Sequence, residues 1–589
     1  MTDPATHRPV IGVAQFGSAT FNGDATFESA TFNGDASFDA ATFNGDAQFH
    51  QAAFAGHAKF REVEFGGVTD FGLATFEGVA AFSSAAFAGE TAFRSTTFAG
   101  MAAFDSTIFV GDAVFDSATF NGEATFRSAT FTWNARFSNA TFAKGAHFSK
   151  ATFAEVGRFS NATFTEVAWF DEATFTGGAW FDEATFIAKA WFTNVAFKGN
   201  AWFEAATFAQ DARFNSSVFE RTAFLGPLTC AGKVGFFHAS FAVAVTLEIA
   251  AKSVSFRRTR WAQPATVWLR YADTDLSDAV AEYPVTIACR PRPFIPVSGS
   301  PIDESILAGL PTDQVRVTSL RGVDAVQLVL TDLDLSGCLF AGTVHLDQLR
   351  IEGDCRFSGP PAGVHRRGRL LLVRYTRRNT LAEEHHWRHT RPWAGTGWEP
   401  PSSDGDVTQP RALAAVYRAL RKSYEDSSNE PGAADFYYGE MEMRRADSRT
   451  APAERGLITA YWALSGYGLR AARATGWLLL AMALTMLVMM LWGLPQRDTP
   501  SLTTGTVAEH RVTMTTNSPD PENPVGPPGD RLTSARFEKS LRIVVNSVIF
   551  RASGQSLTTA GTYTEMASRL TEPVLLGLAL LAVRGRIKR

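Results

Sequence analysis

Phenylalanine recurs from Phe21 to Phe219 at intervals that alternate between six and five residues. Each of the 37 positions in this series is phenylalanine, so a period of eleven residues runs without a break. Intervals of five and six place successive side chains on different sides of an α-helix, which excludes a helical stripe. A fixed period of this kind is typical of a repeat architecture.

A small residue stands two positions before most of these phenylalanines, as Ala25 does before Phe27. Side chains two residues apart on a strand point the same way. The residues between the pairs, such as Asn22-Gly23-Asp24, favour turns. Each unit is therefore expected to be a very short strand and a turn, and stacked coils are expected to form a continuous aromatic ladder.

The Ala-x-Phe pairs, such as Ala118-Thr119-Phe120 and Ala184-Thr185-Phe186, resemble the pentapeptide repeat family in a variant with one extra residue in every second unit. The resemblance implies an all-β, right-handed quadrilateral β-helix. Its interior would be filled by the phenylalanines and by the small residues two positions before them. Four sides would take 22 residues, so Phe21 to Phe219 would make about nine coils and, at ~4.8 Å per coil, a rod roughly 43 Å long.

The register continues beyond Phe219 with other apolar residues, and a weaker five-six series runs from Leu335 to Phe357. A proline-rich stretch around 290–311 separates the two series. We therefore expect an N-terminal tail over 1–13, a solenoid over 14–267, an irregular insertion over 268–324, a second short solenoid segment over 325–360, a basic and proline-rich connector over 361–410, an amphipathic helical region over 411–472 and a membrane module over 473–589.

The membrane module is predicted from two apolar runs. The first, Thr475 to Leu494, has twenty residues without a charge, enough to cross a bilayer core of ~30 Å. The second, Val574 to Val583, spans only if its helix extends back through Arg569 and Glu572, which is costly in lipid. We expect transmembrane helices at about 475–494 and 567–583, with a polar loop and an amphipathic helix between them.

Charge distribution predicts which side of the membrane the solenoid occupies. Residues 1–224 hold 24 acidic against 13 basic residues, whereas the whole chain has a net charge of −4, so the remainder is basic. Arginines precede the first apolar run and a basic cluster ends the chain, and no signal peptide is recognised over Met1 to Pro9. We expect membrane lipid as a partner and a cell-membrane location with the solenoid on the cytoplasmic side.

The C-terminal region carries a second resemblance. The strings YRALRKSY from Tyr417, ADFYYGEMEMRR from Ala434, SGYGL from Ser465 and the closing LALLAVRGRIKR are similar to the tail of bacterial membrane-bound pentapeptide-repeat proteins. This resemblance covers roughly residues 410–589. Two amphipathic helices separated by Asn429-Glu430-Pro431-Gly432 also predict a helical hairpin at its start.

Residues with reactive side chains do not form a catalytic pattern. The cysteines at 230, 289, 338 and 355 lack ligand spacing and are interpreted as core residues, and His385, His386 and His389 are interpreted as part of a solvated basic patch. No nucleotide-binding, nucleophile-elbow or zinc-protease motif is present. We therefore expect no enzyme activity, no cofactor and no metal.

Four tryptophans eleven residues apart form the candidate interaction stripe. Each stands just before a core phenylalanine, and we expect them to stack on one outer or edge ladder spanning alternate sides. The four are Trp169, Trp180, Trp191 and Trp202.

Three functions follow from these features. The first is a membrane-tethered scaffold that presents a rigid β-helix to an unidentified protein partner, with homo-oligomerisation left open. The second is a two-helix pore or ion-channel-like protein, since an amphipathic helix and Thr558 to Tyr563 lie between the two spans, although a T-V-G-Y-G filter is lacking. The third is a DNA mimic that binds gyrase. Basic residues such as Lys59 and Arg61 interrupt the acidic repeats, which disfavours mimicry, and nucleic acid is not expected as a partner.

Overall fold

A computed structural model describes residues 10–296, 299–367, 371–391, 396–401, 407–496, 502–508, 511–517, 521–549, 551 and 554–587. The chain divides into two compact units. The first comprises Met1–Thr408 and Lys422–Ser427, and the second comprises Gln409–Arg421 and Ser428–Arg589. Most of the expected N-terminal tail, residues 1–9, lies outside the described residues.

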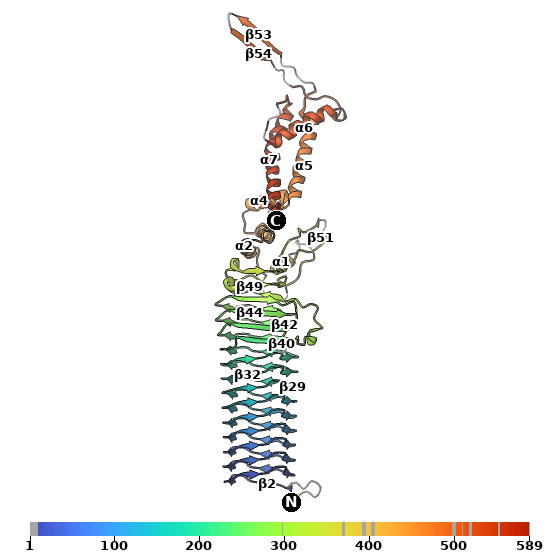
Figure 1. The fold of residues 1–589 in the computed structure, drawn as a ribbon. Coiled ribbons are helices and arrows are strands. Elements are labelled where there is room, and N and C mark those ends of the chain that lie inside the picture. The colour runs from blue at the N-terminus through green and yellow to red at the C-terminus, as the bar shows by residue number, and fades with distance from the viewer. Residues whose placement is uncertain are drawn as a thin grey trace. The chain divides into compact units, whose positions relative to one another are not determined.

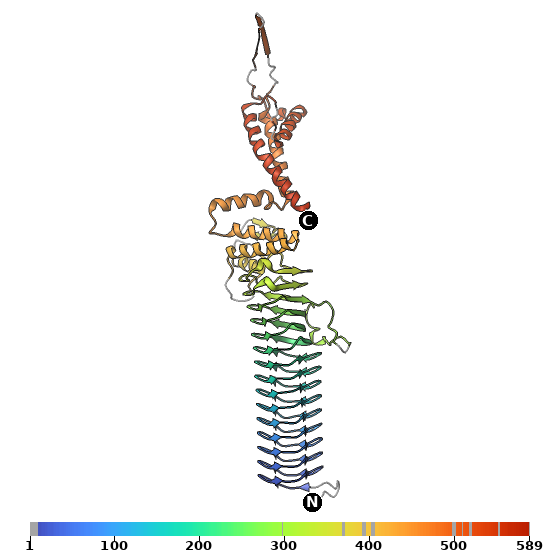
Figure 2. The same ribbon diagram turned by 60° about the vertical axis from the view of Figure 1, so that its left-hand side comes forward.

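The first unit is a parallel β-solenoid of about 16 turns (Figures 1 and 2). One turn holds four two-residue strands: β3 (Thr20–Phe21), β4 (Ala25–Thr26), β5 (Thr31–Phe32) and β6 (Ala36–Ser37). The next strand, β7 (Thr42–Phe43), pairs with β3 and places Phe43 on Phe21. The true repeat is therefore 22 residues, two of the eleven-residue periods, and two-residue strands continue from β1 (Val10–Ile11) to β39 (Val218–Phe219).

The alternation of five and six residues reflects two kinds of corner. In the five-residue corner, Ser18 has a left-handed φ of 57°, and the Ala19 N–H donates to the Phe16 carbonyl at 3.1 Å. The same backbone conformation returns every eleven residues as far as Ser216, on side chains as varied as Leu73 and Lys150. Because few of these residues favour that conformation intrinsically, the hydrogen bonds between turns must hold it in place.

The interior is a column of stacked phenylalanine rings. Phe126 is fully buried, and its ring is nearly parallel to Phe104 and Phe148 at centroid distances of 4.8 and 4.9 Å. It meets Phe115 and Phe137 edge-on at 5.4 and 5.3 Å. Offset stacking and edge-to-face contact are both favourable ring geometries, so each phenylalanine stabilises the turns above and below it.

Beyond Phe219 the strands lengthen and aliphatic residues replace phenylalanine in the core. The strands are β40 (Phe224–Gly235), β41 (Ser240–Phe241), β42 (Val245–Ser255), β43 (Arg260–Trp261), β44 (Ala265–Arg270), β45 (Asp273–Asp275), β46 (Val280–Ala281), β47 (Val285–Cys289), β48 (Arg316–Ser319), β49 (Leu328–Thr331) and β50 (Arg350–Glu352). β47 pairs with β44 on one side and β49 on the other. The parallel register thus continues to the end of the solenoid.

The irregular insertion expected over 268–324 is shorter in the structure. Strands β45 to β48 lie within that range, and the described residues between β47 and β48, 290–296 and 299–315, leave the ladder. The composition did not reveal this turn because Val285, Ile287 and Ala288 are its buried residues on β47, so the phenylalanine signal disappears while the strand pairing remains. In the excursion, Phe294, Ile302 and Leu307 pack with Ala250 of the solenoid.

The second unit is mainly helical. Its elements are α2 (Pro410–Asp426) as far as Arg421, α3 (Glu430–Ala446), α4 (Pro452–Ser465), α5 (Ala471–Val488), the π-helical turn η5 (Met489–Gly493), α6 (Ser534–Val548) and α7 (Thr559–Ile587). The polar loop expected between the apolar helices contains an antiparallel hairpin of β53 (Leu502–Ala508) and β54 (Arg511–Asn517), which the sequence reading missed. Two stretches, Ala471–Gly493 and Thr559–Arg584, are long and apolar enough to cross a membrane by length and composition.

Candidate interaction surfaces

The four tryptophans of the predicted stripe lie on two ladders, not on one. Trp169 on β30 (Ala168–Trp169) pairs with Trp191 on β34 (Ala190–Trp191). Trp180 on β32 (Ala179–Trp180) pairs with Trp202 on β36 (Ala201–Trp202), in a different sheet. A shift of eleven residues is half a turn, so consecutive tryptophans cannot stack on each other. The expectation of a single ladder is therefore wrong.

The first ladder is defined by His147, Trp169, Trp191 and Arg213. The rings of His147 and Trp169 are parallel with centroids 4.0 Å apart, and the Arg213 guanidinium lies 4.9 Å from the centre of the Trp191 ring. His147 Nε2 is also 2.9 Å from Glu123 Oε1. Burial, and then the positive charge of Arg127, lower the pKa of His147. A cation stacked on each end of a tryptophan pair is a cation–π arrangement when the histidine is protonated.

The second ladder is defined by Arg136, Arg158, Trp180 and Trp202. The Arg158 guanidinium lies 4.3 Å from the centre of the Trp180 ring, and Trp202 has 36% of its surface exposed. A Cβ on Gly178 would come within 2.6 Å of the Trp180 indole nitrogen, so glycine leaves room for the ring to lie against the turn. The arginines and His147 are functional candidates that sequence reasoning missed. An offset of 22 residues from a tryptophan would have found His147, Arg158 and Arg213, and a second offset of 22 leads from Arg158 to Arg136.

The first ladder ends beside a surface hollow. A cavity of about 340 Å³ in the turns that follow Trp191 is lined mainly by polar and charged side chains, together with Phe237 and Gly235. Three of them, Arg213, Lys233 and Arg257, are basic, and Asp211 is acidic. The lining therefore favours a ligand with hydrogen-bonding groups and net negative charge rather than an apolar one.

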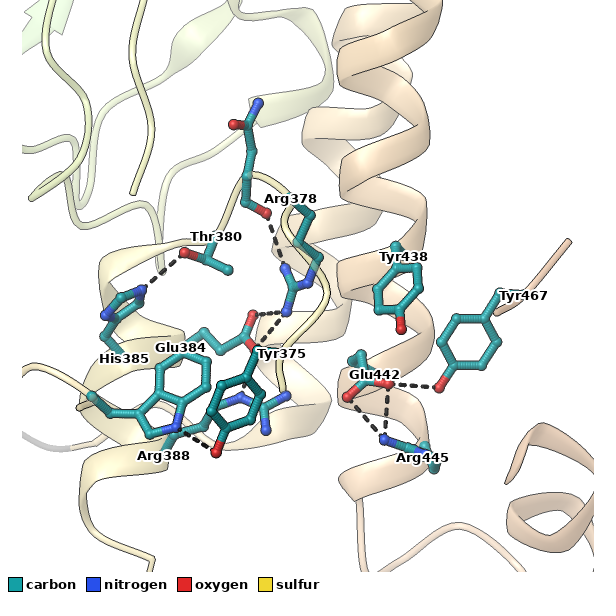
Figure 3. Close-up of polar contacts among 12 residues, drawn as sticks. Tyr375, Arg378, Thr380, Glu384, His385, Arg388, Tyr438, Glu442, Arg445 and Tyr467 are labelled. Carbon is teal, nitrogen blue, oxygen red and sulfur yellow. Dashed lines mark hydrogen bonds and ion pairs between the residues drawn. The ribbon is translucent and has the colours of Figure 1, made fainter. Parts of the chain in front are cut away.

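A buried polar network lies at the C-terminal end of the solenoid, in α1 (Ala382–His389) and the segment before it (Figure 3). Both Glu384 oxygens accept from Arg378 Nη2 at 2.6 Å, and Oε1 also accepts from Arg388 Nε at 2.6 Å. Neighbouring Glu383 accepts from the backbone N–H groups of Phe340 and Ala341 at 2.5 and 2.8 Å. These carboxylates give α1 a specific attachment to the last turns, which makes it a cap.

The histidine cluster in α1 is part of this cap. His385 is buried, and its Nε2 lies 2.9 Å from Thr380 Oγ1, while His389 Nδ1 lies 2.9 Å from the Trp398 carbonyl. Burial lowers the pKa of both His385 and His386, so the neutral imidazoles are favoured. The expected solvated patch is therefore incorrect for His385. Within the described part of the chain, no three His, Cys, Asp or Glu side chains converge in a group that could hold a metal ion.

The helical unit contains two further carboxylate networks. Glu440, 4% exposed, accepts from Arg418 Nε at 3.0 Å and Arg421 Nη1 at 2.9 Å. Glu442 accepts from the Tyr467 hydroxyl at 3.0 Å and from Arg445 (Figure 3). These bonds join α2 to α3, and α3 to the turn between α4 and α5. Each carboxylate in these networks is paired with an arginine, so we interpret the networks as contacts that hold the helices together.

Known sequences provide one similarity. Residues 16–64, 104–152, 144–185 and 159–207 match pentapeptide repeats (9 copies), which confirms that the solenoid is built from these repeats. No curated protein and no solved structure shows significant similarity to the chain.

Proposed function

We propose that this protein is a membrane-tethered scaffold whose solenoid presents rigid, regular faces for protein–protein interaction. The observation that carries the proposal is the pairing of an unbroken parallel ladder with outward columns of tryptophan and arginine. Aromatic residues and arginine are the side chains most enriched at the energetic centres of interfaces. A pentapeptide-repeat solenoid is typically a structural or interaction scaffold rather than an enzyme.

The solenoid in this proposal is a right-handed quadrilateral β-helix. Four strand stacks per 22-residue turn and alternating corners support four sides, and right-handed twist is the general preference of strands. Four flat faces would give the two tryptophan ladders separate surfaces, so that two partners, or two parts of one partner, can bind independently.

The two ladders can be tested separately. We expect Trp169→Ser with Trp191→Ser to abolish capture of one partner, and Trp180→Ser with Trp202→Ser to abolish capture of another or to weaken the same one. Trp133→Ser is the matched control, since Trp133 is 58% exposed and belongs to neither ladder. Cross-linking in cells followed by identification of the captured proteins is the assay. Capture unchanged in all three variants would exclude the ladders as the binding surface.

Membrane tethering rests on the apolar stretches Ala471–Gly493 and Thr559–Arg584. We propose a cell-membrane location with the solenoid on the cytoplasmic side, supported by the arginines before the first stretch and the basic residues after the second. Fractionation of the full chain beside a chain ending at Gln409, with protease added to intact spheroplasts, tests this. The full chain should stay with membranes and the solenoid should be protected. A solenoid digested from outside would reverse the topology.

A second candidate is a pore-forming protein, because α6 packs against both apolar helices. Arg536 of α6 donates to the carbonyls of Met490 and Leu494 at 2.9 Å, and Ser547 Oγ lies 3.0 Å from Ser568 Oγ on α7. A short helix held between two spans is the plan of two-helix channels. Ion flux into liposomes containing the purified protein is the test, and impermeable liposomes with the protein correctly inserted would exclude this function.

A further inference from the structure

Glu572 on α7 is completely buried, and neither of its carboxyl oxygens meets the geometric criteria for a hydrogen bond with any residue that the structure describes. The hydroxyl of Thr485 on α5 is the polar side chain that interacts most directly with this carboxyl group. One turn before Glu572, Ser568 contacts Ser547 of α6 through a 3.0 Å hydrogen bond. The Ser540 hydroxyl, on the same face of α6, is also buried without a partner. A line of polar side chains therefore lies inside an otherwise apolar bundle.

No neighbouring charge compensates a negative charge on Glu572. The elements packed against α7 are α4, α5, η5 and α6, and none of their described side chains forms an ion pair with it. On α5 the only charged residue is Arg473, which donates to the Trp462 carbonyl instead. The titratable and charged residues on α4 to α7 besides Glu572 are Glu454, Arg455, Tyr461, Arg473, Arg536, Glu538, Lys539, Arg542, Tyr563, Glu565, Arg569, Arg584 and Arg586.

The position of Glu572 along the helix raises the energetic cost of a charge on its buried carboxyl group. It lies near the middle of the 26-residue stretch Thr559–Arg584. At ~1.5 Å per residue it stands about 20 Å from the start of that stretch, and the apolar core of a bilayer is ~30 Å thick. An ionisable residue at such depth is costly unless it is neutral or paired.

We propose that Glu572 is an intramembrane proton-binding site, at which the carboxyl group holds a proton between α5, α6 and α7. The part of the argument that concerns depth in the bilayer rests on the membrane tethering proposed above, whereas the burial does not. A neutral carboxyl group needs only weak acceptors, and the hydroxyls of Thr485 and Ser568 are of the right kind. Loss of the proton would leave an unpaired charge in the bundle and loosen the packing of α5 against α7.

Reaction with N,N′-dicyclohexylcarbodiimide tests this proposal, because this apolar reagent modifies protonated carboxyl groups in apolar surroundings. The acid adds across one C=N bond and its proton passes to nitrogen. An acyl shift then gives a stable N-acylurea with no leaving group. The full chain in membranes washed with alkaline carbonate is treated between pH 6 and pH 9, and the peptide containing Glu572 is analysed by mass spectrometry.

We expect this peptide to gain one carbodiimide at pH 7, and the labelled fraction to fall as the pH rises. Labelling should be lost in Glu572→Gln and retained in Glu565→Gln, a matched change two turns earlier on the same helix. An unmodified Glu572 peptide in membrane-retained protein would overturn the proposal. Equal labelling by a water-soluble carbodiimide would overturn it too, since the carboxyl group would then be open to water.

Two further results of the labelling experiment distinguish a proton site from a metal-cation site, and the proton site from the membrane tethering. Protection of Glu572 by Na⁺ but not by choline would mean that the site binds a metal cation, and the proton assignment would be wrong. If the carbonate wash removes the chain, the membrane tethering fails, and labelling of the released protein still decides whether Glu572 holds a proton. If Glu572→Gln fails to fold, the pH dependence of Glu572 labelling in the unaltered chain decides whether this carboxyl group holds a proton.

Discussion

Replacing one ring in the middle of the aromatic column tests whether each turn is held by its neighbours. Phe126→Ala removes a fully buried side chain that stacks on Phe104 and Phe148 at 4.8 and 4.9 Å. A buried Phe→Ala change costs about 3–5 kcal/mol. A loss of about 4 kcal/mol corresponds to a roughly thousand-fold increase in the opening equilibrium. Because each turn contacts only adjacent turns, the loss should be local.

Hydrogen exchange of the full chain, read by mass spectrometry, measures this effect. Peptides spanning residues 104–148 should exchange much faster in Phe126→Ala, whereas peptides around residues 27–60 should be unchanged. Phe21→Ala is the comparison, because Phe21 is only partly buried and its ring is stacked on one neighbour, Phe43, at 4.4 Å. Its cost should be about half as large. Uniform destabilisation of the whole solenoid by Phe126→Ala would refute the nearest-neighbour reasoning.

Two substitutions test the cap, and one labelling experiment tests the burial of two cysteine thiols. Glu384→Ala should cost about 3–5 kcal/mol in urea unfolding followed by tryptophan fluorescence, since it removes the buried carboxylate that both Arg378 and Arg388 bind. The change of exposed Glu399→Ala should cost almost nothing, and equal effects would contradict the network. Burial raises the pKa of Glu383, with two backbone N–H groups opposing it only in part. Its folded pKa then exceeds the unfolded one, so the cap should lose stability as the pH rises above the unfolded value and through the folded one. A thermal melt of Glu383→Gln that keeps this slope would exclude Glu383 as its cause. Burial also raises the pKa of Cys230 to about 12 and of Cys355 to about 11, so both should resist iodoacetamide at pH 8 until the chain is unfolded, and stoichiometric labelling of the native protein would disagree with their burial.

The regular part of the solenoid was predictable because every phenylalanine meets the same surroundings. A residue such as Phe126 has phenylalanines above and below, so one solution satisfies all positions, and the period alone specifies it. The pentapeptide repeats were recognised on this basis and are confirmed. The continuation through β45 to β48 was not predictable from the same signal, because backbone pairing persists there while smaller aliphatic residues such as Val285, Ile287 and Val317 replace phenylalanine in the core.

The candidate site was predicted only in part, because an eleven-residue period does not reveal which residues are neighbours. Backbone hydrogen bonds join residues about 22 positions apart, as from the Phe148 N–H to the Trp169 carbonyl. The tryptophans therefore separate into two ladders, and their charged neighbours come from turns with a different local sequence. The cap formed by α1 depends on contacts between residues more than forty positions apart in the sequence, such as Glu383 with Phe340, and no local sequence pattern predicts these contacts.

The two-strand-per-period geometry has a consequence for how such a protein changes in evolution. Duplicating 22 residues adds one turn and leaves every column in register, so the distance between two bound partners grows in steps of about 4.8 Å. Duplicating eleven residues instead would transfer everything downstream to the opposite faces, and Trp191 would then continue the column of Trp180. Duplication of 22 residues thus changes only the distance between binding surfaces along the solenoid, whereas duplication of eleven residues changes the face on which the downstream surfaces lie.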